Sequence, residues 1–282
     1  MNALEIKNLT KSYPGFTLDN LNLTLPSGCI LGLIGENGAG KSTTIKLILD
    51  MIHKDSGTIT ILGRDNGDGM EVAKEEIGVV LDEAGIPECL TVPQVGKVMK
   101  HTFRNWDAAE YARLTQKLGL PEKKPFKDFS RGMKMKLAIA VAMSHNSKLL
   151  ILDEATSGLD PVVRDEVVEM FSDFTRDENH SILISSHIVS DLEKLCDYVA
   201  FLHKGKLLLC EEKDRLLAEY GLIHCTAKEL KQLPPETVRY TKENPYGVEA
   251  MVRRSAVPDG FSVSPVSIEE MFVFMVKGGA VI

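Results

Sequence analysis

The stretch Gly35-Glu36-Asn37-Gly38-Ala39-Gly40-Lys41-Ser42-Thr43 decides the fold, because it fits the pattern G-x-x-x-x-G-K-[ST] of a phosphate-binding loop. Its glycines let successive backbone N–H groups approach phosphate oxygens without a side chain in the way. We expect Lys41 to neutralise the β- and γ-phosphates of a bound triphosphate and the Ser42 hydroxyl to bind a magnesium ion. The pattern therefore predicts that the first ligand to consider is a nucleoside triphosphate.

The two flanks of this loop are typical of a parallel sheet. Residues 29–34 upstream form a continuous apolar run, as in a strand that is buried on both faces. Downstream, residues from 43 to about 53 indicate a helix whose N-terminus faces the bound anion. Strand, glycine loop and helix follow in the required order, and this context argues against a chance match.

The composition is that of a globular protein with room for more than one domain. The chain has 282 residues, of which 44% are hydrophobic, enough for one large domain plus a small one or for two modest ones. Its longest apolar runs, at 138–143 and 271–276, fall far short of the roughly 20 residues that span a bilayer. The sequence begins without a basic region followed by an apolar one, so secretion is not expected.

The cysteine count indicates the cellular compartment, and the net charge limits the classes of partner. The five cysteines are odd in number and widely spaced, without a C-x-x-C pair, which favours a reducing cytosol over disulfides or structural zinc. The net charge of -7 argues against an extensive nucleic-acid-binding surface. A local basic patch at 117–127 stays open, although a solvated loop is the more usual explanation of such a run.

Apolar periodicity divides the chain into a sheet domain, a helical block and a small C-terminal unit. Alternation between Leu4 and Leu25 indicates half-buried antiparallel strands at the N-terminus. The parallel core strands are expected at 30–34, 77–81, 149–152, 181–185 and 199–202. Helices are expected at 92–101, 107–118 and 131–144, within a helical subdomain of about 88–147 inserted into the sheet domain. Short strands and turns then lead to a terminal helix at about 267–276, so we divide the chain into residues 1–222 and 223–282.

A second predicted strand supplies candidates for the metal ligand and the base. The apolar run at 149–152 ends in Asp153 and Glu154, and in a parallel sheet this end opens beside the glycine loop. We expect Asp153 to bind magnesium and Glu154 to polarise the attacking water as general base. His187 follows the next predicted strand at the same edge, where it could hydrogen-bond the γ-phosphate, although a lone histidine is more often a surface residue. Asp160, before Pro161, fits a helix N-cap, and that role alone explains it.

Together these motifs resemble the nucleotide-binding subunit of ABC (ATP-binding cassette) transporters, over about residues 1–222. The match comprises Walker A at 35–43, Walker B at 149–153 with Glu154, the D-loop at 157–160 and the switch histidine His187. It implies an α/β fold, a P-loop NTPase of the ABC type: a mixed sheet core with N-terminal antiparallel strands, an inserted helical subdomain and a small α/β C-terminal appendage. It also implies that the ligands are ATP and Mg2+ and that Tyr13 stacks on adenine, although a lone tyrosine at such a place is more often a turn residue.

Two positions depart from the family pattern. The signature loop, usually Leu-Ser-Gly-Gly-Gln, is here Phe129-Ser130-Arg131-Gly132-Met133. Ser130 and Gly132 are retained and, with the helix N-terminus that follows, are expected to bind the γ-phosphate of a nucleotide held by a second subunit. Arg131 adds a charge without an assigned task. Where the family has the Q-loop glutamine, this chain has Asp82 and Glu83; Asp82 is a candidate magnesium ligand, but it brings negative charge toward phosphate.

The resemblance implies an ATP-hydrolysing subunit of an ABC transporter, of a bacterial exporter branch whose membrane subunits are separate chains. We expect it to dimerise around two ATP molecules, with a second copy or a paralogous ATPase subunit, and to drive an integral membrane permease. It would then be cytoplasmic and peripheral on the inner face of the cell membrane, with no nucleic-acid partner. One alternative is a soluble ABC ATPase that regulates a ribosomal, nucleic-acid or protein complex. A further alternative is a degenerate module without turnover, against which Glu154 and His187 argue.

Overall fold

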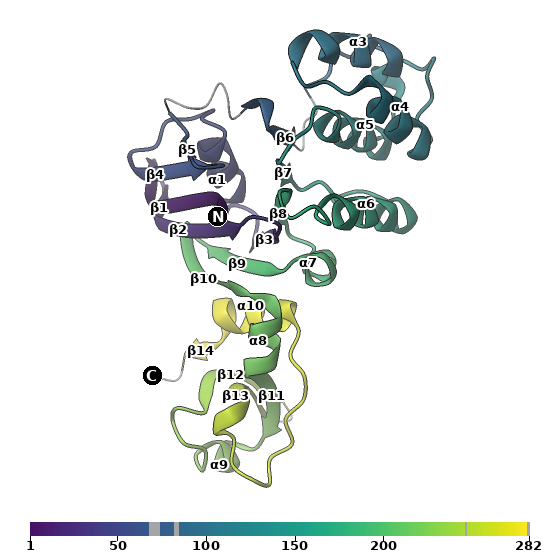
Figure 1. Cartoon of the computed structure of the whole chain (residues 1–282). Helices are drawn as coiled ribbons and strands as arrows, with labels where there is room; N and C mark the ends of the chain where they lie inside the picture. Colours follow the sequence, from purple (N-terminus) through teal and green to yellow (C-terminus); the bar gives the residue numbers. More distant parts are fainter. Residues whose placement is uncertain (68–73, 82–84, 246, 281–282) are drawn as a thin grey trace.

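The computed structural model describes residues 1–67, 74–81, 85–245 and 247–280, and their strands form three sheets (Figure 1). The N-terminal sheet is antiparallel, as expected, and has the order β2-β1-β4-β5. Its strands are β1 (Asn2–Tyr13), β2 (Phe16–Pro26), β4 (Ser56–Ile61) and β5 (Arg64–Asp65). Leucine and isoleucine side chains on its inner face are fully buried, so this sheet covers one side of the nucleotide domain.

The central sheet has the order β10-β9-β3-β8-β7-β6. The five expected parallel strands are present as β3 (Ile30–Gly35), β6 (Ile77–Val80), β7 (Leu149–Asp153), β8 (Ser181–Ser186) and β9 (Tyr198–His203). An antiparallel strand that the sequence analysis did not predict, β10 (Lys206–Glu212), pairs with β9 at the edge and makes the sheet mixed. Every residue of β3, β7 and β8 is buried, because layers cover both faces of these strands.

Helix α1 (Lys41–Ile48) follows β3 directly after the glycine loop. The expected end at about residue 53 was wrong, because Asp50 adopts φ 53°, a left-handed conformation in which the helix cannot continue. The other helices around the central sheet are α6 (Pro161–Phe174) and α7 (Val189–Leu195).

The helical block contains α3 (Val92–Thr102), α4 (Ala108–Lys117) and α5 (Arg131–Met143), each within two residues of its expected bounds. Side chains cap all three helices: Thr91 forms a capping box with Gln94, Asp107 accepts hydrogen bonds from two backbone N–H groups, and Ser130 accepts one. The block joins the sheet tightly where α5 crosses β6, since a Cβ atom at Gly78 would lie 2.4 Å from the carbonyl oxygen of Ala142. The absence of a side chain at Gly78 therefore sets how closely the block approaches the sheet.

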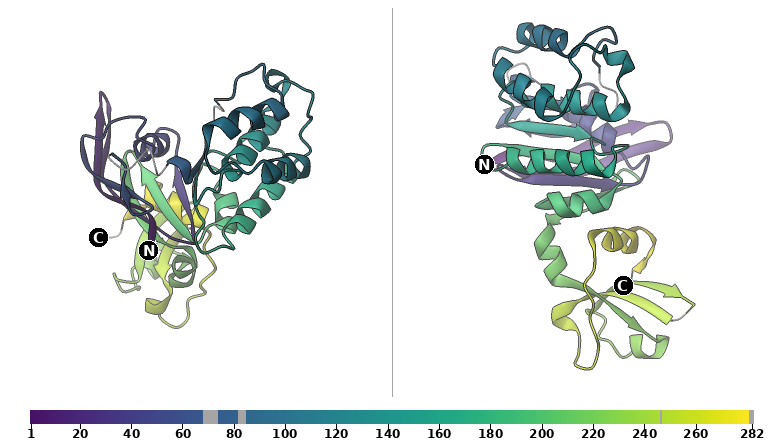
Figure 2. Two further views of the ribbon diagram at one scale, coloured as in Figure 1. Left: turned by 45° about the horizontal axis from the view of Figure 1, so that its top comes forward. Right: turned by 90° about the vertical axis from the view of Figure 1, so that its right-hand side faces the viewer.

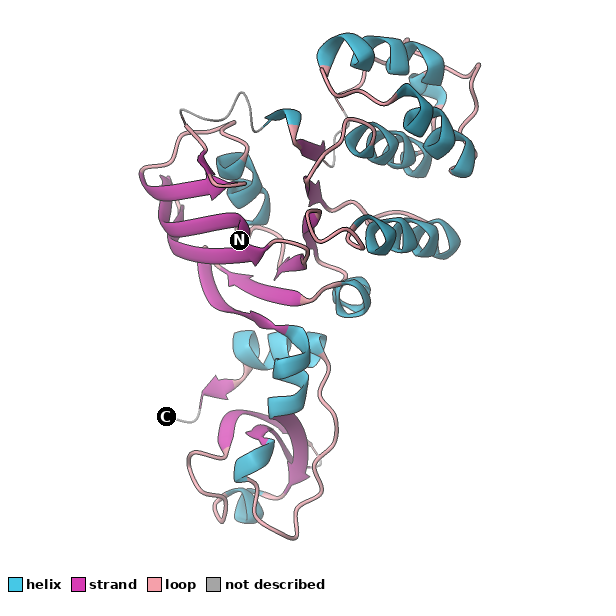
Figure 3. Ribbon diagram, viewed as in Figure 1, coloured by secondary structure: helices cyan, strands magenta, loops and turns pink. Residues whose placement is uncertain are grey.

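The C-terminal unit lies at the opposite end of the central sheet from the helical block (Figures 1 and 2). Its sheet has the order β11-β13-β12-β14. Figure 3 shows strands of this unit in magenta below the central sheet. The elements after β10 are α8 (Lys213–Glu219), β11 (Tyr220–Cys225), α9 (Ala227–Leu230), β12 (Val238–Asn244), β13 (Gly247–Arg253), α10 (Ile268–Lys277) and β14 (Gly279–Ala280). The expected division after residue 222 falls inside β11, whose residues all pair with β13. A division before Tyr220 keeps this strand whole, and we propose that boundary instead.

Helix α10 connects the C-terminal unit to the nucleotide domain. Phe272 packs edge-on against Phe201 of β9, with ring centroids 5.4 Å apart. Apolar residues of both parts belong to one continuous core, including Leu192, Phe201, Met251, Ile268 and Met271. In the part of the chain that the structure describes, no helix has both the length and the apolar composition needed to cross a membrane.

Candidate functional site

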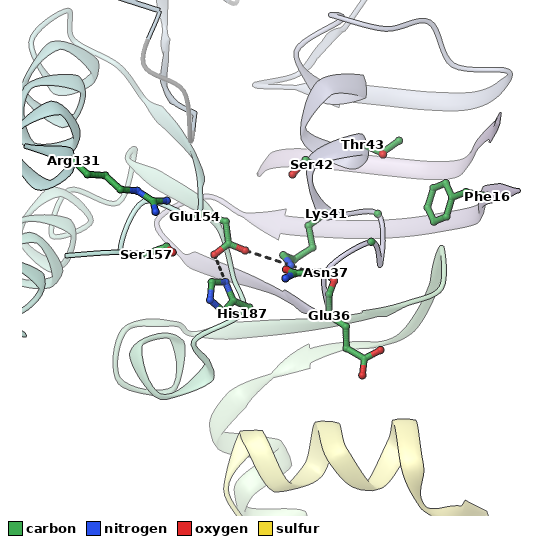
Figure 4. A pocket seen from close by; sticks show the side chains of 12 residues that line it. Phe16, Glu36, Asn37, Lys41, Ser42, Thr43, Arg131, Glu154, Ser157 and His187 are labelled. Atoms are coloured by element: carbon green, nitrogen blue, oxygen red, sulfur yellow. Dashed lines mark hydrogen bonds and ion pairs between the residues drawn. The ribbon is translucent and has the colours of Figure 1, made fainter. Parts of the chain in front are cut away.

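A cleft of about 580 Å³ opens at the carboxyl ends of β3, β7 and β8, where open parallel sheets bind ligands (Figure 4). Residues from five separate segments of the chain line it: Phe16, Glu36, Asn37, Gly38, Gly40, Lys41, Ser42, Thr43, Arg131, Glu154, Ser157 and His187. Most of the phosphate-loop residues proposed from the sequence are in this set, together with Glu154 and His187.

Glycine is required at the three loop positions for different structural reasons. Gly38 and Gly40 adopt φ of 80° and 114°, the left-handed region that favours glycine. Gly35 ends β3, and a Cβ atom there would lie 2.6 Å from the carbonyl oxygen of Leu202 on β9. Gly35 is thus required by strand packing, whereas Gly38 and Gly40 set the curve of the loop. Ala39 is buried and does not line the cleft.

Lys41 begins α1, and its side chain is only 6% exposed. Its ammonium group donates hydrogen bonds to the carbonyl oxygens of Gly35 at 2.7 Å and Glu36 at 3.4 Å. It also lies 3.4 Å from Oε1 of Glu154. Because burial of a charged group is costly unless it is paired, these contacts stabilise the ammonium group within the loop.

Glu154 joins Lys41 to His187 across the cleft. Its Oε2 lies 2.6 Å from Nδ1 of His187, and the imidazole is 47% exposed (Figure 4). Glu154 adopts φ 54°, an uncommon conformation for a residue with a side chain, and its backbone N–H donates to the carbonyl oxygen of Ser185 at 3.1 Å. The backbone is thus held in a strained conformation that directs the carboxylate into the cleft between two cations or hydrogen-bond donors.

The three expected metal ligands, Ser42, Asp153 and Asp82, differ in their positions relative to the cleft. The hydroxyl-bearing Ser42 lines the cleft, while Asp153 is buried at the end of β7 and accepts a hydrogen bond of 2.5 Å from Oγ of Ser185. Asp82 lies outside the described residues. Within those residues no group of three or more His, Cys, Asp or Glu side chains is arranged to hold a metal. One hydroxyl and one carboxylate nevertheless fit Mg2+, which prefers oxygen ligands and usually takes the rest from phosphate and water.

Besides Gly35 and Ala39 of the loop, three residues expected at the nucleotide do not line this cleft: Tyr13, Ser130 and Gly132. Tyr13 is 41% exposed at the tip of the β1–β2 hairpin, with the ammonium group of Lys11 5.6 Å from its ring centroid. Phe16, which pairs with Tyr13 across the hairpin, lines the cleft in its place. The sequence analysis missed Phe16, although its position directly after the turn at Pro14-Gly15 was a usable signal.

The signature residues lie at the start of α5. Oγ of Ser130 accepts a hydrogen bond from the backbone N–H of Met133 at 3.3 Å, and Gly132 is in the first turn. Asp160 similarly caps α6, accepting from the backbone N–H of Val163 at 3.1 Å. These contacts explain Ser130 and Asp160 as helix caps. The role of Ser130 and Gly132 toward a second subunit's nucleotide stays a prediction.

Comparisons with known proteins identify the family that shares this architecture. Residues 18–157 match the family model described as ABC transporter. The lantibiotic transport ATP-binding protein SrtF of Streptococcus pyogenes is 40% identical over 214 residues, which cover 75% of this chain and 91% of that protein. The ABC transporter ATP-binding protein YtrB of Bacillus subtilis is 28% identical over 288 residues and matches 96% of this chain and 97% of its own length.

A solved structure described as an ATP binding subunit of ABC transporter superposes with a TM-score of 0.69 at 29% identity, covering 76% of this chain and 91% of that one. Of these three matches, the one with YtrB extends over the C-terminal unit, and all three include the nucleotide domain. With the Walker motifs gathered around one cleft, these similarities lead to one conclusion: the chain belongs to the ABC transporter family as one of its ATP-binding, ATP-hydrolysing subunits.

Proposed function

We propose that this chain drives separate membrane-spanning subunits by dimerising around two ATP molecules and hydrolysing them with Glu154 as general base. The observation that carries this proposal is the position of the Glu154 carboxylate, 3.4 Å from the ammonium group of Lys41 and 2.6 Å from Nδ1 of His187. Such a bridge places the base beside both a phosphate-binding cation and a group that can orient it.

The residues of the cleft divide the chemistry among them. A triphosphate that enters the cleft attracts Lys41 away from Glu154, which leaves this carboxylate available for the proton of the attacking water. His187 orients Glu154 and, through its exposed ring, reaches the transferred phosphoryl group. Ser42 and Asp153 would hold magnesium, which would supply positive charge to the phosphates. The side chain of Phe16 or Tyr13 offers an aromatic face to the adenine ring of the nucleotide.

The position of the signature residues supports a head-to-tail dimer. Ser130 is exposed at the N-terminus of a 13-residue helix and lies outside the lining of its own cleft. A helix N-terminus favours anions, so a second subunit that brings its nucleotide to Ser130 and Gly132 would share each site between two chains.

A separate groove of about 530 Å³ between the central sheet and the helical block suits the membrane partner. Met51, Val79 and Phe103 line this groove, and Met51 is 55% and Val79 36% exposed. Exposed apolar side chains that gather in one groove indicate an interaction site. The family consists of transporters, and the described residues contain no helix able to span a membrane, so we assign this groove to a cytosolic segment of the membrane-spanning subunit. The chain would then be peripheral on the inner face of the membrane. The comparisons do not favour the alternative of a soluble regulator.

Two variants test the site. Glu154→Gln keeps the shape of the side chain but cannot accept the water proton, so we expect an ATP-bound dimer that elutes early in size-exclusion chromatography with ATP and magnesium. Lys41→Ala removes the cation that receives the phosphates, and we expect its ATP turnover to fall by about a hundredfold or more. A monomeric Glu154→Gln variant under these conditions, or undiminished turnover in Lys41→Ala, would sink the proposed site.

A further inference from the structure

Arg131 stands where the family pattern has a glycine, and its side chain is turned toward the cleft of its own chain. It is the first residue of α5 and lines the cleft together with Lys41, Glu154 and Ser157. Figure 4 shows this side chain extending from α5 toward Glu154 and Ser157. A residue of the signature loop therefore reaches the site of the same chain, in addition to any contact that the loop makes with a second subunit.

The guanidinium group of Arg131 lies directly over Gly158 in the loop that follows Glu154. A Cβ atom added at Gly158 would lie 3.1 Å from Nη1 of Arg131 and 3.2 Å from its Cδ and Cζ atoms. Gly158 also adopts φ 73°, a conformation that side chains disfavour. Both the backbone conformation and the overlying guanidinium group thus require glycine at this position.

The first turn of α5 also lies near the loop at a second point. A Cβ atom added at Gly132 would lie at an ordinary van der Waals distance, 3.5 Å, from Cδ2 of Leu159. Within the loop, the Ser157 N–H donates to the Glu154 carbonyl oxygen at 3.0 Å and the Leu159 N–H to the Thr156 carbonyl oxygen at 3.4 Å. From α6, the Arg164 guanidinium group donates to the Leu159 carbonyl oxygen at 3.2 Å, while the buried hydroxyl of Thr156 has no hydrogen-bond partner among the described residues. Contacts from α5 therefore add to the burial of Ala155 and Leu159 and to the hydrogen bonds that hold this loop.

We propose that Arg131 is a positioning residue that ties the signature segment to the loop at 154–160 of the same chain, and so keeps Glu154 in place when the helical block moves. Its planar, permanently charged guanidinium group can lie flat on a glycine backbone while facing carboxylate and phosphate, which a lysine ammonium cannot do. The proposal rests on the proposed role of Glu154 as general base.

Kinetics of the purified full-length chain test this role. Because a small misplacement of a catalytic group costs rate and not ground-state binding, we expect Arg131→Ala to lower kcat for magnesium–ATP about ten- to a hundredfold, with KM changed less than about twofold. Arg131→Lys keeps the charge without the planar fork and should recover only part of the loss.

Hydrogen exchange of the nucleotide-free chain gives a readout that does not depend on turnover. In Arg131→Ala the backbone amides of residues 155–160 should exchange about tenfold faster, while amides of β3 and β7 should not change. If Glu154→Gln retains turnover, the proposed function fails, yet this exchange measurement still decides whether Arg131 holds the loop.

A double-mutant comparison tests the contact with Gly158. Gly158→Ala should displace the guanidinium group and reproduce the kcat loss, but should add little in the Arg131→Ala background. Gly119→Ala is the matched control, because Gly119 has φ 65° with open space around it and so carries backbone strain without the contact. Unchanged kcat and exchange in Arg131→Ala, a rise of KM alone, or additive effects of the two substitutions would each overturn the proposal.

Discussion

Ser185 shows how one buried hydroxyl organises the acidic end of β7. Its Oγ donates to Oδ1 of Asp153 at 2.5 Å, while its backbone carbonyl accepts the N–H of Glu154. Ser185 is completely buried on the neighbouring strand β8, so it fixes the Asp153 carboxylate and the backbone of Glu154 relative to the sheet. A hydrogen bond that orients a metal ligand commonly matters nearly as much as the ligand itself.

We therefore expect Ser185→Ala to raise the magnesium concentration needed for half-maximal ATPase activity by about tenfold or more. The loss of a buried hydrogen bond should also lower the free energy of unfolding by about 1–3 kcal/mol. Ser181→Ala is the control, because Ser181 is equally buried on β8 and accepts a hydrogen bond from the Gly28 N–H far from Asp153. Magnesium titrations that coincide for the two variants would contradict this role.

Sequence patterns at the residue scale identified side chains whose spacing along the chain reflects phosphate chemistry. The expectation that Lys41, Glu154 and His187 meet at one sheet edge agrees with their distances, since parallel strands bring their carboxyl ends together. Phe16, Ser185 and the contact of Arg131 with Gly158 were not predicted. Each of these depends on a partner from a distant segment, which local spacing does not encode.

The junction between the helical block and the central sheet contains a buried histidine. His145, just after α5, stacks on Phe103 with ring centroids 4.0 Å apart, and its Nδ1 donates to the carbonyl oxygen of Glu75 at 3.1 Å. Burial lowers the pKa of His145 below the ordinary value, against smaller opposing effects of the Glu75 carbonyl and carboxylate. The neutral imidazole is therefore the form that suits the folded junction.

This shift predicts a pH dependence of stability. The unfolded chain takes up the proton near pH 6.5, whereas folded His145 takes it up only at lower pH, so the free energy of unfolding should fall as the pH decreases from about 7 toward 5. Above about pH 7 both states are neutral and the effect vanishes. Urea unfolding across this range should give a flatter profile for His145→Gln than for the parent chain. His101→Gln, at an exposed position on α3, controls for the loss of a histidine elsewhere in the block. Equal slopes for the parent chain and His145→Gln would refute the assignment.

Elements were predictable where apolar periodicity and caps agreed. The five parallel strands and the three helices of the block were expected within about two residues of their observed bounds, because buried strands and capped amphipathic helices carry strong local signals. The end of α1 at Ile48 and the antiparallel strand β10 were not. The left-handed conformation of Asp50 and the pairing of β10 with β9 depend on tertiary structure, which local apolar periodicity does not determine.

At the scale of the whole molecule, the C-terminal unit shares its core with the nucleotide domain. Phe272 of α10 is buried against Phe201 of β9, and residues before and after Tyr220 belong to the same apolar cluster. A shared core couples the unfolding of its parts. The sequence alone indicated a separate appendage because the composition and turns change after Gly221. The packing of the two parts into one core leaves no such local pattern in the sequence.

We expect Phe272→Ala to lower the free energy of unfolding by about 3–5 kcal/mol, because it leaves a cavity under β9. Phe272→Leu, which keeps most of the apolar volume, should cost less than about 1.5 kcal/mol. Scanning calorimetry of the parent chain should show a single transition for both parts. Two resolved transitions in the parent chain, or a Phe272→Ala variant as stable as the parent, would argue that the C-terminal unit is merely tethered.

The ion pair between Lys41 and Glu154 predicts that the cleft selects ligands by charge. The Glu154 carboxylate lies 3.4 Å from the lysine ammonium group, so an entering anion competes with that carboxylate. Coulomb attraction grows with the charge of the competitor, which favours a triphosphate over inorganic phosphate or chloride. We therefore expect small anions such as chloride to leave the Lys41–Glu154 ion pair intact, and a polyanion that spans the loop to break it.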